Sequence, residues 1–406
     1  MYAIVLAIPM IVGLTGPARP DGHRFTLQTV NGRSIETPRV SIERGVVNYQ
    51  AGAQDADIPL EDVSSLTPPH APDRAGRVDG PQRVVILADG GRLAGELVAD
   101  GSANNSIVLE VEWSEALAIP YSAVAAVQFD LRDNAAAEEA LAALLEKRDG
   151  GHDVLIVLRD GKPVTLPGIL EGISPQSWSF RIGRQVRTAA LEKAYGVVLG
   201  SSGPSRRGPA TLHLLEGDSL TAWVRTADGA GLELDAAALG KVTVPWSSVE
   251  SIDLRSQRVV DLSEMVPAEV VQRSMFDAHW PVTKDRNLQG RPIVLAGRSY
   301  SRGIAVHSYC ALTFRLDGAF ERFLCDVGID ESVAPHGSAV FRVTTDGKVA
   351  FESPSIGPTT PQHVDVDLKG VNVLVLECDV GDDLDLSDHG AWAGARLIRA
   401  RIDGIR

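Results

Sequence analysis

The sequence predicts an all-β protein in which tandem small β-barrel-like repeats are followed by a jelly-roll β-sandwich. The chain has 406 residues, of which 44% are hydrophobic and 23% are charged, a balance typical of globular proteins. Its 39 glycines and 23 prolines separate short runs rich in Val, Ile and Thr, which is typical of many strands joined by turns. A strand–turn–strand pattern repeats through the first part of the chain, and the texture changes near Val259.

The repeated pattern is an apolar run, an acidic residue with glycine, and a second apolar run. It stands at 84–95, 154–162 and 212–220. Such turns favour hairpins because glycine accepts the positive φ of a tight turn. The units also end alike, in segments that contain a proline, at 58–63, 119–124 and 244–249. Together these features predict four units, at about 25–66, 83–130, 153–199 and 210–254.

A single helix is predicted between the second and third units, from Asn134 to Arg148, because Ala, Leu, Glu and Lys dominate this segment. Asp133 or Asn134 can cap its start. We expect the helix to pack between those two units. The predicted domains are a signal peptide at 1–18, a first β repeat and linker at 19–82, a second repeat with the helix at 83–150, a third repeat at 151–200, a linker and fourth repeat at 201–258, and the sandwich at 259–406.

The strand plan of the units resembles Sm-like and SH3-like barrels. Barrels of this kind sometimes bind RNA, but the net charge of −14 would repel a phosphate backbone. We therefore predict that nucleic acid is not a partner. A structural spacer is the expected role of the units, and a protein partner bound through them stays open.

The N-terminus predicts export. An apolar run without charge extends from Tyr2 to Leu14, and small residues follow at Gly16 and Ala18. This order resembles the apolar region and cleavage site of a signal peptide. The run is short for a membrane span, although an anchor or a buried strand remains an alternative. The prediction is a secreted, periplasmic or cell-surface protein with no integral membrane segment in its mature chain.

Three cysteines, Cys310, Cys325 and Cys378, lie inside apolar strand-like runs of the C-terminal region. Export would permit a disulfide, but an odd number leaves at least one thiol free. We expect small buried core residues.

Sequence signatures of enzymes are absent. The chain has no HExxH, GxSxG, GxxxxGK[ST] or glycine-rich dinucleotide motif. The prediction is that the protein is not an enzyme. A glycosidase needs only two carboxylates, so 53 acidic residues leave that alternative open.

Six segments of the C-terminal region come in a recognisable order. They are 280–285, 302–307, 326–330, 338–343, 345–348 and 387–397. This order resembles the NPCBM family, carbohydrate-binding modules found beside family-98 glycoside hydrolases, and the resemblance covers about 260–402. It implies a galactose-binding-like β-sandwich that holds glycans without hydrolysing them. Gly390, Gly394, Pro335 and His336 depart from the family pattern, which leaves the sugar open.

Candidate sugar-binding residues are those with aromatic faces or paired polar groups in predicted turns and strand ends. A pyranose ring needs a planar aromatic surface for its C–H face and hydrogen-bonding groups for its hydroxyls. The candidates are Trp280, Lys284, Asp285, His307, Asp388, His389 and Trp392. Three alternatives stay open: Trp392 as a core residue, His307 as a structural histidine, and Asp388 with His389 as a turn lock.

A calcium ion is a further expectation. Five aspartates stand between positions 379 and 388, and calcium is held by six to eight oxygen ligands. The candidate ligands are Asp330, Glu331, Asp383 and Asp385. The alternative is a solvated acidic loop without an ion.

The sequence therefore favours a secreted, non-catalytic carbohydrate-binding protein that holds glycans through its C-terminal sandwich. Two alternatives remain: a structural or adhesive scaffold that binds protein partners, and a glycoside hydrolase or an accessory subunit of one.

Overall fold

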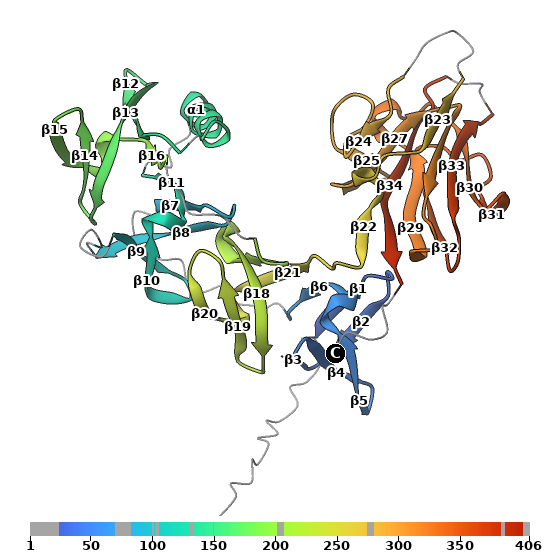
Figure 1. Cartoon of the computed structure of the whole chain (residues 1–406), viewed down its shortest axis with the longest axis horizontal. Coiled ribbons are helices and arrows are strands. Elements are labelled where there is room, and N and C mark those ends of the chain that lie inside the picture. The colour runs from blue at the N-terminus through green and yellow to red at the C-terminus, as the bar shows by residue number, and fades with distance from the viewer. Residues whose placement is uncertain are drawn as a thin grey trace, which may run out of the picture.

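The computed structural model describes residues 24–69, 83–99, 101, 105–129, 134–148, 150–200, 207–273, 280–382 and 386–400. Within these residues one α-helix stands among 34 strands, so the all-β class is confirmed (Figure 1). No helix in this part of the chain is both long and apolar enough to cross a membrane. The predicted signal peptide at 1–18 lies outside the described residues.

The strands of the N-terminal region form four units, which we number in chain order. Unit 1 contains β1 (Phe25–Thr29), β2 (Ser34–Thr37), β3 (Val40–Glu43), β4 (Val46–Ala51), β5 (Gln54–Pro59) and β6 (Val63–Thr67). Unit 2 contains β7 (Arg83–Leu87), β8 (Arg92–Ala99), β9 (Ser106–Val111), β10 (Ser114–Pro120) and β11 (Val124–Gln128). Unit 3 contains β12 (Asp153–Arg159), β13 (Lys162–Ile173), β14 (Ser177–Ile182), β15 (Gln185–Ala190) and β16 (Gly196–Val198). Unit 4 contains β17 (Ala210–Leu214), β18 (Ser219–Ala227), β19 (Gly231–Ala236), β20 (Gly240–Pro245) and β21 (Val249–Leu254).

The four units share one pattern of strand pairing. The last strand pairs antiparallel with the first in each of them, as β6 does with β1 and β11 with β7. A short 3-10 turn precedes that last strand in every unit. Pro59, Pro120 and Pro245 stand directly before the turn in three units, and Ala190 takes this place in unit 3. The proline segments seen in the sequence are therefore the entry to this turn.

The units are joined through their last strands rather than standing apart. β11 pairs with β16, with Val127 opposite Val197, and β21 pairs with β6, with Ile252 opposite Leu66. These ladders join unit 2 to unit 3 and unit 4 to unit 1, and the pairing of β18 with β8, at Ser219 and Arg92, completes one 21-stranded network. Four of the five residues of β11 are buried, so an unpaired edge here would expose apolar surface. Within the described residues, no ladder joins the last two strands of any unit. Closure of a unit into a barrel would need such a ladder, and it remains a prediction.

The helix α1 (Ala135–Glu146) lies where the sequence predicts it. The Asn134 side chain caps its start by accepting a hydrogen bond of 3.0 Å from the Ala137 N–H. Its buried face, Ala137 and Leu141, packs in one apolar cluster with Ala126 of unit 2 and Tyr195 of unit 3. The prediction that the helix packs between these two units is confirmed.

Two packed sheets form the C-terminal β-sandwich. One sheet has the order β24-β27-β34-β29-β32 with β22 on β34, and the other has the order β23-β28-β33-β30-β31. The strands are β22 (Val259–Asp261), β23 (Glu269–Gln272), β24 (Thr283–Lys284), β25 (Ile293–Leu295), β26 (Arg298–Tyr300), β27 (Gly303–His307), β28 (Cys310–Arg315), β29 (Phe320–Ile329), β30 (Ala339–Thr345), β31 (Lys348–Glu352), β32 (Gln362–Asp367), β33 (Val373–Val380) and β34 (His389–Arg399). Their inward side chains, among them Phe323, Phe341 and Leu376, form a single core.

All three cysteines are free and buried in this core, as expected. Cys310 of β28 lies opposite Cys378 of β33 in the ladder. Burial raises the pKa of the Cys310 thiol to about 11, and it raises the pKa of Cys325 and Cys378 well above the ordinary thiol value. The thiols are therefore neutral core groups at neutral pH.

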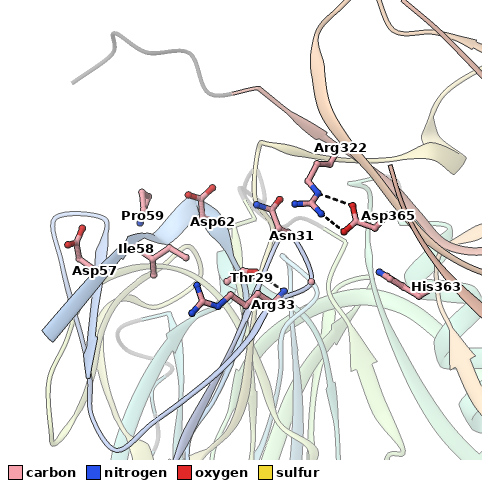
Figure 2. A pocket seen from close by; sticks show the side chains of 11 residues that line it. Thr29, Asn31, Arg33, Asp57, Ile58, Pro59, Asp62, Arg322, His363 and Asp365 are labelled. Carbon is pink, nitrogen blue, oxygen red and sulfur yellow. Dashed lines mark hydrogen bonds and ion pairs between the residues drawn. The ribbon is translucent and has the colours of Figure 1, made fainter. Parts of the chain in front are cut away.

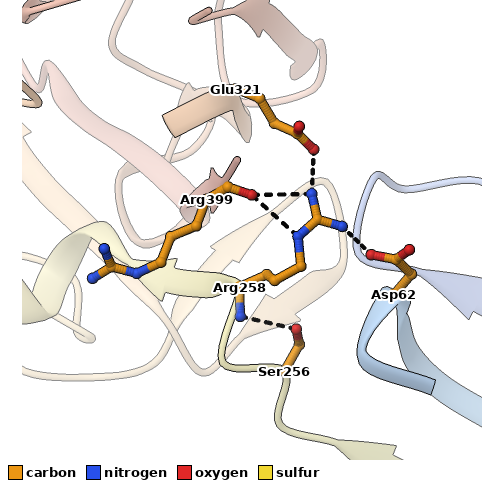
Figure 3. A network of polar contacts seen from close by, with 5 residues as sticks. All are labelled: Asp62, Ser256, Arg258, Glu321 and Arg399. Atoms are coloured by element: carbon orange, nitrogen blue, oxygen red, sulfur yellow. Dashed lines mark hydrogen bonds and ion pairs between the residues drawn. The ribbon is translucent and has the colours of Figure 1, made fainter. Parts of the chain in front are cut away.

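Unit 1 packs against the sandwich, as the blue and red strands of Figure 1 show. Val30, in the turn after β1, is buried in an apolar cluster with Leu324 and Ile398. Beside it, the buried Arg258 guanidinium donates to the carboxylates of Asp62 and Glu321 (Figure 3). It also donates to the Arg399 carbonyl oxygen at 3.0 Å. One arginine thus connects unit 1, the segment between unit 4 and the sandwich, and two strands of the sandwich.

Candidate functional site

Three rings from distant parts of the sandwich sequence meet at one edge of the fold. His307 ends β27 and His389 begins β34, and the antiparallel register places them opposite each other. Their ring centroids lie 5.9 Å apart. Trp280 stacks on His307 with centroids 5.2 Å apart and planes within 5°, and it lies 5.3 Å from the His389 ring. We call Trp280, His307 and His389 the aromatic edge. The turn around His307 and the 388–392 segment, both parts of the family pattern, lie together here as that pattern leads one to expect, whereas the position of Trp280 was not predicted.

One ring of the aromatic edge is accessible to solvent, and the other two are buried. Trp280 is 37% exposed, whereas His307 and His389 are buried. The His307 Nδ1 lies 2.8 Å from the Ser308 carbonyl oxygen, which fixes the ring. The buried His389 Nδ1 has no hydrogen-bond partner among the residues that the structure describes. Burial lowers the pKa of His389, and the neighbouring His307 lowers it further, although Asp330 acts in the opposite direction. A neutral His389 ring can donate with one nitrogen and accept with the other.

Asp388 supports this edge from below and does not face solvent. Its side chain is fully buried and accepts hydrogen bonds from the Ser308 hydroxyl and, at 2.9 Å, from the Ser338 N–H. The expectation that Asp388 touches a sugar is therefore corrected, because both carboxylate oxygens are used inside the fold. The residue ties the turn after His307 to the start of β34.

Trp392 also needs correction as a sugar-binding residue. Its side chain is fully buried, and its ring packs edge-on against Phe341 with centroids 5.2 Å apart. It lies in the middle of β34 between Ile304 and Val327 on the neighbouring strands. Its position in an apolar strand places it in the core, the alternative that the sequence left open.

Lys284 and Asp285 lie away from the aromatic edge. Lys284 pairs with Ile304 near the start of β27, which is about 10 Å from His307 at a strand rise of about 3.3 Å per residue. Its ammonium group donates to the Met265 carbonyl oxygen at 2.7 Å. Asp285 accepts from Arg302 at 2.9 Å and from the Gly303 N–H at 3.1 Å. Burial raises the pKa of Asp285, but these hydrogen bonds and the positive charge of Arg302 outweigh it, so the net shift is downward.

Further polar residues that sequence reasoning missed lie beside the aromatic edge. Gln272 of β23 donates its side-chain N–H to the Trp280 carbonyl oxygen at 2.7 Å. The Arg273 guanidinium lies 4.8 Å from the centre of the Tyr309 ring, and the Tyr309 hydroxyl donates to Glu377 at 3.2 Å. Tyr309 follows His307 by two positions, which was the only signal available in the sequence.

The candidate calcium ligands are only partly described. Asp383 and Asp385 lie outside the described residues. Asp330 is buried and accepts hydrogen bonds from the Asn287 side chain and from the N–H groups of Ser332 and Val294, at 2.9–3.0 Å. Glu331 accepts from the Gly297 N–H. Within the described ranges, no group of three or more His, Cys, Asp or Glu side chains is arranged to hold a metal. Calcium stays a prediction.

A second feature of interest is a groove between the N-terminal units and the sandwich. A cavity of about 790 Å³ lies between unit 1 and strands β29 and β32. Figure 2 shows Asn31, Arg33 and Asp57 of unit 1 on one side and Arg322 and Asp365 of the sandwich on the other. A neighbouring cavity of about 1170 Å³ extends from unit 1 and unit 4 to the strands around Tyr300 and Arg396. Thr29, Gly32 and His363 line both, and we call the larger cavity the interdomain groove.

Comparison with known families identifies the class of the sandwich. Residues 259–398 match the NPCBM/NEW2 domain. This part of the chain is an NPCBM domain, and the resemblance drawn from the six sequence segments is confirmed. The match covers the sandwich.

Individual relatives are larger enzymes or modules of enzymes. The chain is 26% identical over 125 residues to a protein of Renibacterium salmoninarum named "Putative endo-alpha-N-acetylgalactosaminidase", and it spans 8% of that protein's length. Among solved structures, the chain is 29% identical to CBM51 from Clostridium perfringens GH95, solved in complex with methyl-galactose. The aligned region covers 34% of this chain and 99% of the CBM51 chain, with a TM-score of 0.32. The chain is 14% identical to the tandem CBM51 modules of a family 98 glycoside hydrolase from Streptococcus pneumoniae. The aligned region covers 93% of this chain and 88% of the tandem modules, with a TM-score of 0.32.

Proposed function

We propose that the protein is an exported, non-catalytic glycan-binding protein that holds a sugar at the aromatic edge. The arrangement of Trp280 against His307 and His389 is the observation that carries this proposal. The NPCBM domain and the relative solved with methyl-galactose support the ligand class. The apolar run at 2–14 supports export.

The chemistry of the aromatic edge suits a pyranose ring. His307 covers one face of Trp280, and the exposed part of the indole can contact the C–H face of a sugar. The His389 Nδ1 is buried, so His389 contributes through its position against Trp280, and the hydrogen bonds to sugar hydroxyls must come from exposed groups at this edge. Each such hydrogen bond contributes about 0.5–1.5 kcal/mol net, so affinity for a single sugar is expected to be weak. Firm retention then requires several contacts or several copies.

Asp388 acts in this proposal as a positioning residue. Its hydrogen bonds to Ser308 and Ser338 hold the two strand ends that carry His307 and His389. Asp388→Ala would leave these donors unpaired inside the fold. Loss of sugar binding in that variant is expected to accompany a lower melting temperature, whereas Trp280→Ala is expected to leave the melting temperature unchanged.

The absence of catalysis is part of the proposal. Glycoside hydrolysis requires two carboxyl groups about 5–9.5 Å apart that are free to meet the substrate. At the aromatic edge Asp388 is buried, and Glu377 is engaged by Tyr309 and Arg342. Neither is a free acid in contact with solvent at this site, which supports binding without turnover.

A second candidate role is protein binding through the N-terminal units. Ile169 of β13 and Val186 of β15 flank Arg181 of β14 in one cross-strand row, so the three side chains share a face. Ile169 is 46% exposed and Val186 is 56% exposed. These two apolar side chains, beside the Arg181–Glu171 ion pair, offer a small surface for a protein partner. This role is compatible with sugar binding in the sandwich.

A glycan array with the full chain tests the proposal. Val349→Ala is the matched control for Trp280→Ala, because Val349 is an exposed apolar side chain on another strand of the same sandwich. Wild type and Val349→Ala should retain the same glycans, and Trp280→Ala should lose them. Incubating the retained glycans with wild type should release no free sugar. An array without any retained glycan contradicts the binding claim, and released sugar contradicts the non-catalytic claim.

A further inference from the structure

We propose that the interdomain groove binds a second ligand, a glycan that carries carboxylate groups, through Arg396 and Arg255. This inference rests on the proposed glycan-binding function, but it concerns a separate site that needs the N-terminal units. Tyr300, Arg396 and His363 come from the sandwich, Arg255 follows unit 4, and Ser64 and Ser65 come from unit 1. The NPCBM domain alone would lack one wall of this site.

Each carboxylate that lines the interdomain groove contacts a cationic or hydrogen-bonding protein group. Asp326 accepts from the Tyr300 hydroxyl at 2.7 Å and lies within 3.3 Å of Arg298 and 2.7 Å of the His363 ring. Asp261 and Glu264 both pair with Arg302 at 3.3 Å. Asp253 lies 3.0 Å from the His213 ring. Arg302 is also paired with Asp285, so its one charge is shared among three carboxylates, and an incoming anion must bind at other arginines of the groove.

Two guanidinium groups of the groove have no such partner. Arg396 donates only to the Gly394 carbonyl oxygen, at 3.3 Å, and no carboxylate oxygen lies within 4 Å of it among the described residues. It is half-buried, and burial lowers its pKa although Asp326 and Asp261 act in the opposite direction. Arg255 is exposed, and its guanidinium makes no hydrogen bond or ion pair in the described part of the chain. A partly buried cation without a counter-ion is costly, so an anion that enters the groove is favoured.

The shape of the groove leaves room beside Arg396. Gly394 has a φ of +60°, and a Cβ at this position would lie 3.5 Å from the Tyr300 ring and 3.8 Å from the Arg396 guanidinium. Glycine therefore keeps the space between these two side chains open. Arg298 lies over the Tyr300 ring, 4.9 Å from its centre, so the ring is held in place.

The remaining lining points to a sugar rather than a simple ion. The groove has a volume of about 1170 Å³, far more than one phosphate ion fills, and pockets for extended ligands reach about 1,000 Å³. Ser64, Ser65, Thr211 and Gln28 add neutral donors and acceptors on the wall formed by units 1 and 4, which also carries Arg255. A sugar chain with carboxylates would pair its charge with Arg396 and Arg255 and its hydroxyls with these neutral groups. The net charge of −14 opposes anions elsewhere on the surface, which restricts binding to the groove.

The contact between unit 1 and the sandwich supports a preformed site. Arg258, with Asp62 and Glu321, and the apolar cluster of Val30 with Leu324 hold the two walls at one separation. A groove with fixed walls loses little freedom when a ligand binds, which favours affinity.

The test is calorimetric titration of the full chain with three probes: a galacturonate oligomer, a neutral galactose oligomer of the same length, and inorganic phosphate. The galacturonate oligomer should bind wild type, and Arg396→Gln or Arg255→Gln should weaken it at least tenfold. Arg396→Lys, which keeps the charge, should recover part of the affinity. Arg184→Gln is the matched control, because Arg184 of unit 3 is exposed and forms no ion pair with any described residue, and this variant should bind as wild type does.

Several outcomes would overturn the inference. They are failure of the galacturonate oligomer to bind wild type, equal binding to Arg396→Gln and Arg255→Gln, and phosphate binding as tight as that of the oligomer. Melting curves would show whether Arg396→Gln remains folded. Because Arg255 is exposed, Arg255→Gln gives a second variant that leaves the core unchanged. Trp280→Ala separates the two sites: it should lose the neutral glycan and keep the galacturonate oligomer, so failure at the aromatic edge leaves the groove result readable.

Discussion

The N-terminal units and the sandwich use buried polar groups for different purposes. In the units these groups lie at contacts between modules: Asp89 of unit 2 accepts from Thr221 of unit 4 at 2.7 Å, and Asp218 of unit 4 accepts from the Ala94 N–H of unit 2 at 2.8 Å. In the sandwich they gather under one exposed ring, where Asp388 supports the ends of β27 and β34. The units thus use buried polarity to assemble a scaffold, and the sandwich uses it to shape a surface.

The largest expected effect concerns the contact between the two regions. Arg258→Met leaves the Asp62 and Glu321 carboxylates without their cation, and breaking a buried ion pair costs about 3–5 kcal/mol. Scanning calorimetry should then show two separate transitions where wild type shows one. The triple variant Asp62→Asn, Glu321→Gln, Arg258→Met removes every charge and should recover much of the loss. A single unchanged transition in Arg258→Met would mean that the two regions are not coupled through this arginine.

A smaller effect is expected where units 2 and 4 meet. Burial raises the pKa of Asp218 from 3.8 to about 7, and Glu112 and Glu216 add to this, although the Ala94 N–H and Arg92 act in the opposite direction. The folded state therefore holds a proton that the unfolded state releases, and stability falls as pH rises from about 4 to about 7. Asp218→Asn keeps an oxygen for the Ala94 N–H and cannot ionise. It should be more stable than wild type by about 2–4 kcal/mol at about pH 8.

Urea unfolding at several pH values measures this difference. The two proteins should have similar stability near pH 4, and the gap should open as pH rises through 7. Parallel pH profiles for wild type and Asp218→Asn would contradict a buried, proton-binding Asp218.

The resemblance to a known family and the local sequence patterns predicted different features of the structure. Alternating apolar residues and turn chemistry located most strands and the capped helix, because these are local properties. The proximity of His307 and His389 followed from the family segments. The burial of Trp392 could not be predicted from these segments, because an aromatic residue in an apolar strand suits either a hydrophobic core or a sugar-binding site.

Contacts between distant segments could not be read from the sequence. Arg258 and Asp62 are 196 positions apart, and although Asp62 lies in the proline segment 58–63, nothing in that segment points to Arg258. The pairing of β11 with β16 depends on two short apolar strands that look like ordinary interior strands of separate units. Asp388 belongs to a polar turn segment in the sequence, and only the fold buries it below the aromatic edge.

The smallest predicted effect is the pH dependence of sugar binding. The pKa of His389 is lowered from 6.5 by burial and by His307, so the neutral ring is the folded form at neutral pH. Because the folded pKa lies below the unfolded one, this contribution to stability is present above about pH 6.5 and is lost as pH falls through the folded pKa. Glycan affinity should fall a few-fold between about pH 7.5 and about pH 5. His336→Gln, which changes an exposed histidine, should follow the wild-type profile, whereas a flat profile in wild type would argue against a role for His389.

The most direct test of the central claim is a titration of wild type, Trp280→Ala and Val349→Ala with the strongest glycan from the array, with melting curves for all three. The account predicts weak, saturable binding by wild type and Val349→Ala. It also predicts at least a tenfold loss in Trp280→Ala with an unchanged melting temperature. Equal affinity of all three proteins for the glycan would contradict the account, because the sugar would then be held somewhere other than the aromatic edge.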